Sequence, residues 1–581
     1  MDLTKVSVLQ VLVLVPTLVI VSSQDDSMQA ISDIIAASHA DCRRELNPGM
    51  AIAIVKGGRT LLSRGFGVTS LHGNIPVTSS TRFNVASLTK ALTAALLLKV
   101  MEESGRYNIS TPVREIMGRY FRFADDLRTQ HATAEDVLSH KMAVPANNKI
   151  RFDSTLSRRT LPGRLRFLNS LDTFRSTYMY SNLMYGLASR MTEVIAGERW
   201  EDLAERYFFR PLDMHRSTFV TQLDLSELNT AKPYQNYFGV LKPISSELLR
   251  QYGELVGSGG LVSTADDMAQ WMNFFLTGGF SARGQRVMSE ESLRELQKPR
   301  TAMPMVLFSQ PDFPVTASFD IYGMGWWLGY YRGFPVLGHS GASYGYRAFV
   351  VLVPSLKAGI FVVMTGDDTG YLYRGPLISL LLDHVMGVTP WVNASVLCSF
   401  PQPWQPSRNQ PTVPPYDTSR ALAHNLTAYV GTYVNPGYGR LDIRLRHNGK
   451  AHGARLGRSP RRVQLELVYG YGTWDLIPMA PHATSPSRQT ADADPSDLLE
   501  YFYGKGSNVT QFIDTSPIIV HPPPTGSAVI VRITVPGFET RIPPVFWRYE
   551  ATSGGISWRG RDRTVLVYIM FWMLLCCGLR R

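Results

Sequence analysis

The pattern of hydrophobic positions is strongest in one stretch near the N-terminal end, Thr81 to Gly105. From Leu88 to Val100 the chain is mostly Ala, Leu, Thr and Val, and only Lys90 and Lys99 are charged. This run is too long for a strand and is apolar on nearly every side, which is typical of a buried helix. We therefore expect a central buried helix that begins at Ser87.

The segments around this helix alternate between helical and strand patterns. A helix is expected from Ser27 to about Leu46, followed by a β-hairpin from Met50 to Val55 and from Thr60 to Gly67. The later helices are expected from Ser110, over Glu135 to His140, Leu183 to Ile195 and Trp200 to Phe209, after Thr264 as N-cap, and finally over Leu377 to Met386. Before that last helix, strands are expected at Tyr322 to Tyr330, Pro335 to His339, Tyr346 to Val353 and Gly359 to Met364. This order predicts an α+β, three-layer domain over residues 24–398, with an antiparallel sheet that combines strands from both ends.

The C-terminal part has a different pattern. Residues 399–420 are crowded with proline, which is typical of an extended linker. Residues 421–550 hold short β-rich runs separated by turns and lack a helical period, so a small all-β domain, barrel or sandwich, is expected. Its strands are expected at Tyr429 to Tyr433, Arg440 to Leu445, Val463 to Tyr469, Thr473 to Ile477, Leu499 to Tyr503 and Val529 to Val535.

Both ends of the chain carry apolar segments that we place outside the folded domains. Residues 1–23 read as a secretory signal peptide, because a short apolar run follows Lys5 and leads to small residues at Ser22 and Ser23. Residues 551–581 end in the apolar run Thr564 to Leu579. This tail fits a lipid-anchor signal, a short membrane span or simple secretion equally well. We expect a secreted or extracellular protein, with anchoring to the cell surface through the tail as the alternative.

Sequons and cysteines agree with secretion. Glycosylation is expected at the sequons of Asn108, Asn393, Asn425 and Asn508. Two of the 4 cysteines lie in the C-terminal tail, which leaves Cys42 and Cys398 as a candidate disulfide in an oxidising compartment. The cysteine and histidine spacing predicts no metal site, and no cofactor is expected.

Composition and charge limit the class of protein. At 581 residues the chain is long enough for two or three folded units, and 44% hydrophobic with 18% charged residues is a globular composition. The net charge is +12, but basic residues are scattered, and only Arg440 to Arg462 resembles a patch. A solvated loop explains this patch better than a polyanion or matrix contact does. We expect no nucleic-acid partner, and a membrane only through the C-terminal tail.

Ser87 and Lys90 give the first indication of chemistry. They stand one helical turn apart, on one face of the expected helix. A lysine inside a buried helix must find a polar partner or lose its proton, and beside a serine it can activate a nucleophile. The Ser-x-x-Lys pattern is loose, and alone it favours an ordinary N-cap serine as strongly as a nucleophile.

Two further patterns follow in order. In the first, Tyr180 is a poor base at a pKa near 10, but the Lys90 cation would lower its pKa if it lay nearby, and Asn182 offers an amide donor and an acceptor. In the second, Gly338 to Ala342 begins a strand of small residues, which lets a substrate approach backbone N–H groups that stabilise an oxyanion. Alone, each is explained as well by an ordinary turn.

Together these patterns resemble the serine β-lactamase and penicillin-binding-protein superfamily, especially its branch of class C β-lactamases, D-alanyl-D-alanine carboxypeptidases and esterases. The likeness covers about Ser27 to Gly387. It rests on Phe83 to Lys90, Asp136 to His140, Tyr180 to Asn182, Gly259 to Asp267, Tyr322 to Trp327 and Gly338 to Gly341. In addition, Tyr429 to Tyr433 and Asn435 to Gly439 resemble the β-domain that follows this hydrolase in some members.

The resemblance implies a catalytic mechanism. Ser87 would be the acylated nucleophile, with Lys90 and Tyr180 as its proton-transfer partners, and the backbone N–H groups of Ser87 and Ala342 would form the oxyanion hole. The resemblance also implies that the first and last helices pack on the same face of the sheet, which would bring the two candidate disulfide cysteines together.

The resemblance also implies a substrate site and shows two departures. Asn182 would contact a substrate amide, and His339, Ser340, Gly341 and Ala342 would line the site. β-Lactamases usually have lysine where this chain has His339, so a fixed cation for a substrate carboxylate is missing, whereas family esterases tolerate histidine there. The loop from Ser139 to Pro145 lacks the glycine of the family pattern, and we expect a reshaped entrance.

Two functions follow as hypotheses. The first is a secreted serine hydrolase that cleaves an amide or ester of a small or peptide-like acyl substrate. The alternative is a non-catalytic extracellular-matrix protein, for example of a biomineral or shell matrix, or a binding protein, derived from this fold. The altered entrance loop and the basic β-domain favour the second, whereas the complete set of Ser87, Lys90, Tyr180 and His339 favours the first.

Overall fold

The computed structural model describes residues 27–146, 148–237, 240–406, 422, 424–446, 465–479, 500–506, 518–521, 523, 529–539, 541–549, 551–552 and 555–556. The expected signal peptide, most of the proline-rich linker and of the C-terminal tail, Asn508 and the arginines from Arg455 to Arg462 lie outside the described residues.

The core of the first domain is an 8-stranded antiparallel sheet in the order β2-β1-β13-β12-β11-β10-β9-β8. Its strands are β1 (Gly49–Lys56), β2 (Arg59–Gly67), β8 (Thr301–Phe308), β9 (Ala317–Tyr322), β10 (Trp327–Tyr331), β11 (Phe334–Ser343), β12 (Tyr346–Val353) and β13 (Ala358–Thr365). The N-terminal hairpin joins the last strand, with Met50 opposite Met364. The expectation that the sheet combines strands from both ends of the domain is therefore confirmed.

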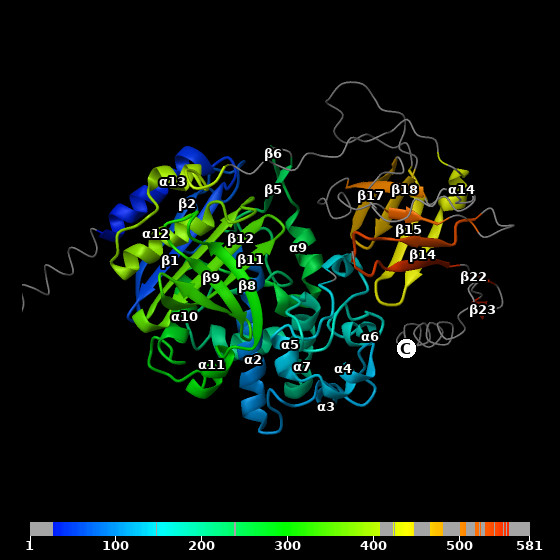
Figure 1. The fold of residues 1–581 in the computed structure, drawn as a ribbon, viewed down its shortest axis with the longest axis horizontal. Coiled ribbons are helices and arrows are strands. Elements are labelled where there is room, and N and C mark those ends of the chain that lie inside the picture. Colours follow the sequence, from blue (N-terminus) through cyan, green and yellow to red (C-terminus); the bar gives the residue numbers. More distant parts are fainter. Residues whose placement is uncertain are drawn as a thin grey trace, which may run out of the picture.

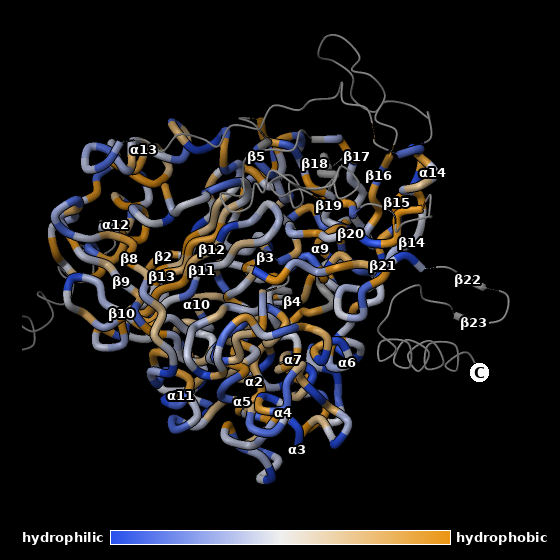
Figure 2. Tube along the Cα trace, turned by 45° about the vertical axis from the view of Figure 1, so that its right-hand side comes forward, coloured by the Kyte–Doolittle hydropathy of each residue, from blue (hydrophilic) through white to orange (hydrophobic). Residues whose placement is uncertain are grey.

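Helices cover both faces of this sheet, so the domain has three layers (Figure 1). Along β1, Ile52 and Ile54 pack into one hydrophobic core, while Ala51 and Ala53 pack into the other. One core includes the N-terminal helix, α12 (Arg374–Met386) and α13 (Ala394–Ser399), and the other includes α2 (Thr89–Ser104), α7 (Asn182–Ala196) and α10 (Ala265–Leu276). Figure 2 shows the hydrophobic segments gathered along the strands and these helices.

Shorter elements hold the helical region together. They are α3 (Val113–Met117), α4 (Asp126–His131), α5 (Ala134–Leu138), α6 (Leu161–Leu165), α8 (Trp200–Ala204), α9 (Ser246–Tyr252) and α11 (Glu290–Leu296), with the strand pair β5 (Tyr234–Tyr237) and β6 (Val240–Pro243). Thr264 caps α10, as expected, because its side chain accepts from the N–H of Asp267. The helix expected over Trp200 to Phe209 changes after Ala204 into a π-helical turn, η4 (Glu205–Phe209).

The C-terminal part forms a closed barrel, one of the two expected architectures. Its strands are β14 (Gly431–Asn435), β15 (Gly439–Leu445), β16 (Leu465–Tyr469), β17 (Gly472–Met479), β18 (Glu500–Gly506), β19 (Ile518–Val520), β20 (Arg532–Thr534) and β21 (Val545–Tyr549), after the short helix α14 (Leu426–Tyr429) and before the pair β22 (Ala551–Thr552) and β23 (Gly555–Ile556). In the described part of the basic patch, Arg440 and Arg444 pair with Asp442, and Arg446 pairs with Asp475. Within the described ranges, no helix combines the length and the hydrophobicity that crossing a bilayer requires.

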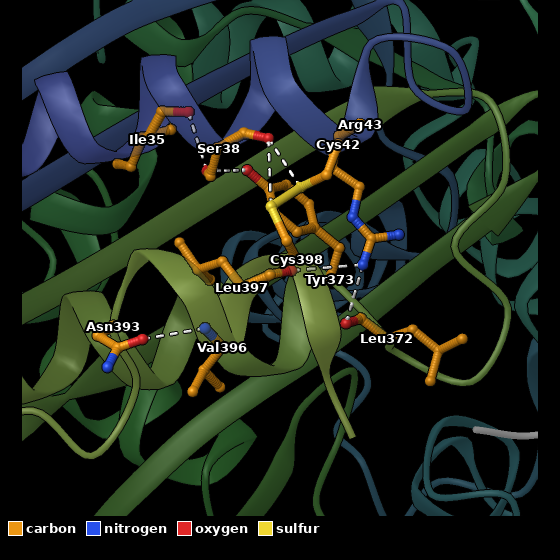
Figure 3. Close-up of a disulfide and its surroundings, with 10 residues drawn as sticks. All are labelled: Ile35, Ser38, Cys42, Arg43, Leu372, Tyr373, Asn393, Val396, Leu397 and Cys398. Atoms are coloured by element: carbon orange, nitrogen blue, oxygen red, sulfur yellow. Dashed lines mark hydrogen bonds between the residues drawn. A yellow bond between two sulfur atoms is a disulfide. The ribbon is translucent and has the colours of Figure 1, made fainter. Parts of the chain in front are cut away.

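The predicted disulfide is present and joins the two ends of the first domain (Figure 3). Cys42 lies in the π-helical turn η1 (His39–Arg43) that ends the N-terminal helix, and Cys398 lies in α13, with 5.7 Å between their Cα atoms. Beside the bond, the Arg43 guanidinium donates to the carbonyl oxygens of Leu372 and Leu397. The first and last helices thus pack together on one face of the sheet.

Removing this bond in a Cys42→Ser/Cys398→Ser variant should lower the free energy of unfolding by about 2–5 kcal/mol, because a crosslink over a long loop restricts the unfolded chain. The residues joined are 356 apart in sequence. Chemical denaturation under non-reducing conditions measures the difference, and the wild type with added reductant should reproduce it. A variant as stable as the oxidised wild type would contradict this prediction.

Candidate active site

Ser87 lies in a short 3-10 turn, η2 (Ala86–Leu88), between β3 (Phe83–Asn84) and the buried helix α2. β3 pairs with β7 (Leu261–Ser263), which also pairs with β4 (Thr218–Phe219). Ala86 has a positive φ of 49°, a left-handed conformation that an alanine rarely adopts. Ser87 is half-buried, the N-cap of α2 is Leu88 and the Ser87 hydroxyl does not cap the helix, so the N-cap interpretation is wrong.

The side chain of Lys90 reaches Ser87 from inside the protein. Lys90 is fully buried, and its Nζ lies 3.1 Å from the Ser87 Oγ, 2.7 Å from the Asn182 Oδ1 and 2.6 Å from the Ser258 carbonyl oxygen. All three oxygens are neutral. The expected convergence of the Ser87 hydroxyl and the Lys90 amine is therefore present.

Burial sets the protonation of Lys90. Loss of hydration lowers the pKa of Lys90 well below its usual value, and the positive charge of Arg151 lowers it further. A neutral amine has two N–H donors and one lone pair. In that form the two shorter contacts, to Asn182 and Ser258, use the donors and leave the lone pair for the Ser87 hydroxyl, which is the arrangement of a base beside a nucleophile.

Tyr180 completes the contact with Ser87. Its hydroxyl donates to the Ser87 Oγ over 2.8 Å, and the Lys90 Nζ lies 4.7 Å from the centre of its ring. Burial raises the pKa of Tyr180, and this effect outweighs the hydrogen bond to Ser87, which lowers it. The expectation that Lys90 lowers the pKa of Tyr180 and favours a phenolate is therefore wrong: burial lowers the pKa of Lys90 and raises that of Tyr180.

Asn182 and Asn148 extend the network. Asn182 is the first residue of α7; its Oδ1 accepts from Lys90, and its Nδ2 donates to the Asn148 Oδ1 over 2.6 Å. Asn148 begins a 3-10 turn, η3 (Asn148–Phe152). Sequence reasoning missed Asn148, because it lies in an irregular loop with neither a motif nor a hydrophobic period.

His339 lies in the site, and both of its ring nitrogens form hydrogen bonds within the protein. Its Nδ1 donates to the Ser340 carbonyl oxygen (2.7 Å), so its Nε2 accepts from the Tyr322 hydroxyl (3.2 Å), and its ring stacks on Trp327. Burial lowers the pKa of His339 to about 3. The imidazole is therefore neutral, and the place of the usual lysine holds no cation.

The remaining residues of the third motif lie beside Ser87. The Ser340 hydroxyl accepts from the hydroxyl of Tyr371, a residue that sequence reasoning missed because it enters from the segment before α12. Gly341 packs so closely that a Cβ there would lie 2.3 Å from the Val85 carbonyl oxygen. Ala342 lines the cavities on both sides of Ser87.

The entrance loop, Ser139 to Pro145, has a left-handed backbone conformation at two residues, although it lacks the glycine of the family pattern. Ala143, at the position of the missing glycine, has a φ of 50°, and His140 has a φ of 59°. These residues therefore adopt the left-handed conformation that a glycine would favour. His140 is buried, its Nδ1 accepts from the N–H of Ser181, and its ring centre lies 4.6 Å from that of Tyr180.

Two cavities meet at Ser87. The smaller, of about 400 Å³, is lined by polar residues that include Asn84, Arg151 and Ser343. The larger, of about 870 Å³, is lined by Tyr180, His339 and Ser340 among others. Ser87, Asn148, Asn182 and Ala342 line both. An extended molecule can thus lie across the hydroxyl, with one end in each cavity.

Comparisons with known proteins identify relatives of this chain. A family model described as Beta-lactamase matches residues 36–382. The chain is 27% identical over 446 residues to the unguisins hydrolase ungD of Aspergillus violaceofuscus (strain CBS 115571). The matched region covers 70% of this chain and 76% of that protein. It is 23% identical over 369 residues to the D-alanyl-D-alanine-carboxypeptidase/endopeptidase AmpH of Escherichia coli (strain K12), which covers 59% of this chain and 86% of that protein. The solved structure of the octameric penicillin-binding protein homologue from Pyrococcus abyssi matches this chain with a TM-score of 0.52 and 17% identity. The match covers 89% of this chain and 99% of that chain, and it shows the fold alone.

The burial of neutral His339 should make folding sensitive to acid. Its pKa is about 3 in the folded protein and near 6.5 in the unfolded chain, so between these values only the unfolded chain binds the proton, and stability falls as the pH falls. Between pH 7 and pH 5 this proton should cost about 2 kcal/mol. A His339→Gln variant should therefore lose about that much less stability than the wild type over the same range, measured by denaturant titration. Equal losses in the two proteins would contradict the prediction.

Proposed function

The chain belongs to the beta-lactamase family, and on that premise we propose that it is a serine hydrolase that cleaves an amide or ester through an acyl-enzyme on Ser87. The observation that carries the proposal is the position of one hydroxyl between an amine and a phenol. The Ser87 Oγ lies 3.1 Å from the Lys90 Nζ and 2.8 Å from the Tyr180 hydroxyl oxygen. Relatives named as an unguisins hydrolase and as a carboxypeptidase/endopeptidase support hydrolysis.

Acylation follows from the neutral state of Lys90. The Ser87 Oγ attacks the substrate carbonyl while its proton passes to the Lys90 amine. The backbone N–H groups of Ser87 and Ala342 stabilise the oxyanion. The bond to the leaving group breaks as Tyr180 gives it the phenolic proton, and the Lys90 ammonium returns its proton to Tyr180. For deacylation, water attacks the acyl carbon and gives a proton to the same pair, the bond between the acyl carbon and the Ser87 Oγ breaks, and the Ser87 Oγ takes up that proton.

The two cavities then have different roles. The leaving group must receive its proton from Tyr180, and Tyr180 lines only the larger cavity. The leaving group therefore departs through the larger cavity, and the acyl group occupies the smaller one, beside Asn182 and Arg151. Because His339 is neutral, the leaving group is held without a cation at the position of the third-motif lysine.

We propose that the enzyme acts outside the cell. The disulfide between Cys42 and Cys398 supports an oxidising compartment. The asparagines of the three described sequons, Asn108, Asn393 and Asn425, are exposed and accessible to glycosylation. The expected N-terminal signal peptide is the basis for proposing export, and the apolar C-terminal tail is the basis for proposing attachment to the cell surface.

The nucleophile can be identified directly. A fluorophosphonate probe should attach to Ser87 in the wild type, and Ser87→Ala should reduce labelling at least a thousandfold, as mapped by mass spectrometry of the adduct. Ser104→Ala, an exposed serine at the opposite end of α2, is the matched control and should label normally. Labelling that persists in Ser87→Ala would refute the assignment. A folded wild type that never labels would favour the non-catalytic alternative.

The role of Lys90 predicts a pH profile. Labelling should rise with pH as the amine loses its proton, and the midpoint should lie well below 10.5, because burial lowers the pKa of Lys90. Lys90→Arg introduces a guanidinium that stays protonated and cannot accept the proton, so labelling should fall by about 10²–10⁴-fold. Stopped-time labelling across the pH range measures both effects. A midpoint at the pKa of an exposed lysine, or normal labelling of Lys90→Arg, would contradict the proposal.

A further inference from the structure

The C-terminal barrel contacts the active-site region at the turn η3 and the residue that follows it. The N–H of Tyr471, in the hairpin between β16 and β17, donates to the Phe152 carbonyl oxygen over 3.0 Å. The Phe152 ring meets the ring of Trp474 edge to face, with centres 5.9 Å apart. Phe152 itself is 1% exposed. The barrel thus holds the last residue of η3 through both backbone and side chain.

The closeness of this contact depends on two glycines of the barrel. A Cβ at Gly470, where φ is +54°, would lie 1.6 Å from the Phe152 carbonyl oxygen. A Cβ at Gly439 would lie 1.8 Å from the Asp153 Oδ2, and this carboxylate forms a buried ion pair with Arg164. The backbone of the barrel therefore approaches the residues at this end of η3 at distances that no side chain would allow.

The other end of η3 carries Asn148, which reaches the catalytic network. The Asn148 Oδ1 accepts from the Asn182 Nδ2, and the Asn182 Oδ1 accepts from Lys90. An amide side chain can present either its oxygen or its nitrogen to a neighbour. With an acceptor fixed on the Nδ2 side, the oxygen of Asn182 faces the Lys90 amine. Asn148 thus determines whether the oxygen or the nitrogen of the Asn182 amide faces Lys90.

A short 3-10 turn holds its own position weakly, because its hydrogen bonds have poor geometry. In the structure η3 lies between the barrel hairpin and the start of α7, and the barrel stands beside the helical region that carries the site (Figure 1). Two hydrogen bonds and one turn of chain connect the barrel hairpin to Asn182.

We propose that Asn148 is a positioning residue for Lys90 and that the C-terminal barrel holds it in place through η3. The barrel is therefore part of the machinery that sets the activity of Ser87. The consequence for activity rests on the proposed function, whereas the mechanical connection from Gly470 to the start of α7 does not.

The test compares two glycine-to-alanine variants of the full chain. Gly470→Ala would place a methyl group against Phe152, whereas Gly387→Ala, at the end of α12, has a similar positive φ of 71° with nothing within 4 Å. Gly470→Ala should slow fluorophosphonate labelling of Ser87 at least tenfold, and Gly387→Ala should leave it unchanged. In hydrogen–deuterium exchange, Gly470→Ala should raise exchange in residues 148–152 and in the first turn of α7, while Gly387→Ala should not.

Variants of Asn148 show whether the effect passes through this residue. Asn148→Ala should also slow labelling at least tenfold, and the Gly470→Ala/Asn148→Ala double variant should be no slower than Asn148→Ala. Asn148→Asp keeps an acceptor for Asn182, so its labelling should recover at a pH above the midpoint, which the loss of a merely structural side chain would not allow. Its negative charge should also raise the pKa of Lys90 and move the pH midpoint of labelling upward.

Each outcome decides a separate claim. Labelling of Gly470→Ala at the rate of Gly387→Ala, or effects of Gly470→Ala and Asn148→Ala that multiply fully, would overturn the role of the barrel. If the wild type shows no adduct on Ser87, the proposed function fails, and hydrogen exchange alone then decides the connection. Unchanged exchange at the start of α7 in Gly470→Ala would overturn that connection as well.

Discussion

The active site depends on one amine, that of the Lys90 side chain, which is buried in the protein among neutral partners. Lys90 is fully enclosed, and the oxygens that it meets, from Ser87, Asn182 and Ser258, carry no charge. An ammonium ion held this way would lose its hydration without an opposite charge in return. Loss of the proton resolves this cost, and the product is a base directed at a serine. The chemistry of the site is therefore a consequence of burial rather than of an ion pair.

Close packing is what lets distant segments meet around this amine. Gly325 lies so near α2 that a Cβ there would be 2.8 Å from the Lys90 carbonyl oxygen, and Gly341 brings β11 equally close to the turn before Ser87. The fold thus holds α2 and β11 close to their neighbours at positions where a larger residue would push them apart, and Lys90 reaches Asn182 at the start of α7. Asn148 joins this network through Asn182, and the barrel contacts the other end of the turn η3 that carries Asn148.

Much of this arrangement could be predicted from the sequence, and the failures have physical causes. The hydrophobic pattern located α2, most strands of the sheet and most strands of the barrel, because burial imposes periodicity on long segments, whereas β9, β19 and β21 were not predicted. β8 was missed because Pro304 interrupts its pattern, which an edge strand tolerates. Asn148 and Tyr371 were missed because contacts between irregular loops leave no periodic trace. The expected lowering of the Tyr180 pKa by Lys90 was wrong because the effect of burial on both residues depends on the full enclosure of the pair, which a sequence does not display.

The central claim is that one hydroxyl reacts while an amine accepts its proton and two backbone N–H groups face the developing charge. A crystal structure of the protein after reaction with a fluorophosphonate tests this most directly. The account predicts phosphorus bonded to the Ser87 Oγ, the phosphoryl oxygen between the N–H groups of Ser87 and Ala342, and the Lys90 Nζ still within hydrogen-bonding distance of the Ser87 Oγ. An adduct on another residue, or a phosphoryl oxygen that lies outside hydrogen-bonding distance of the N–H groups of Ser87 and Ala342, would contradict it.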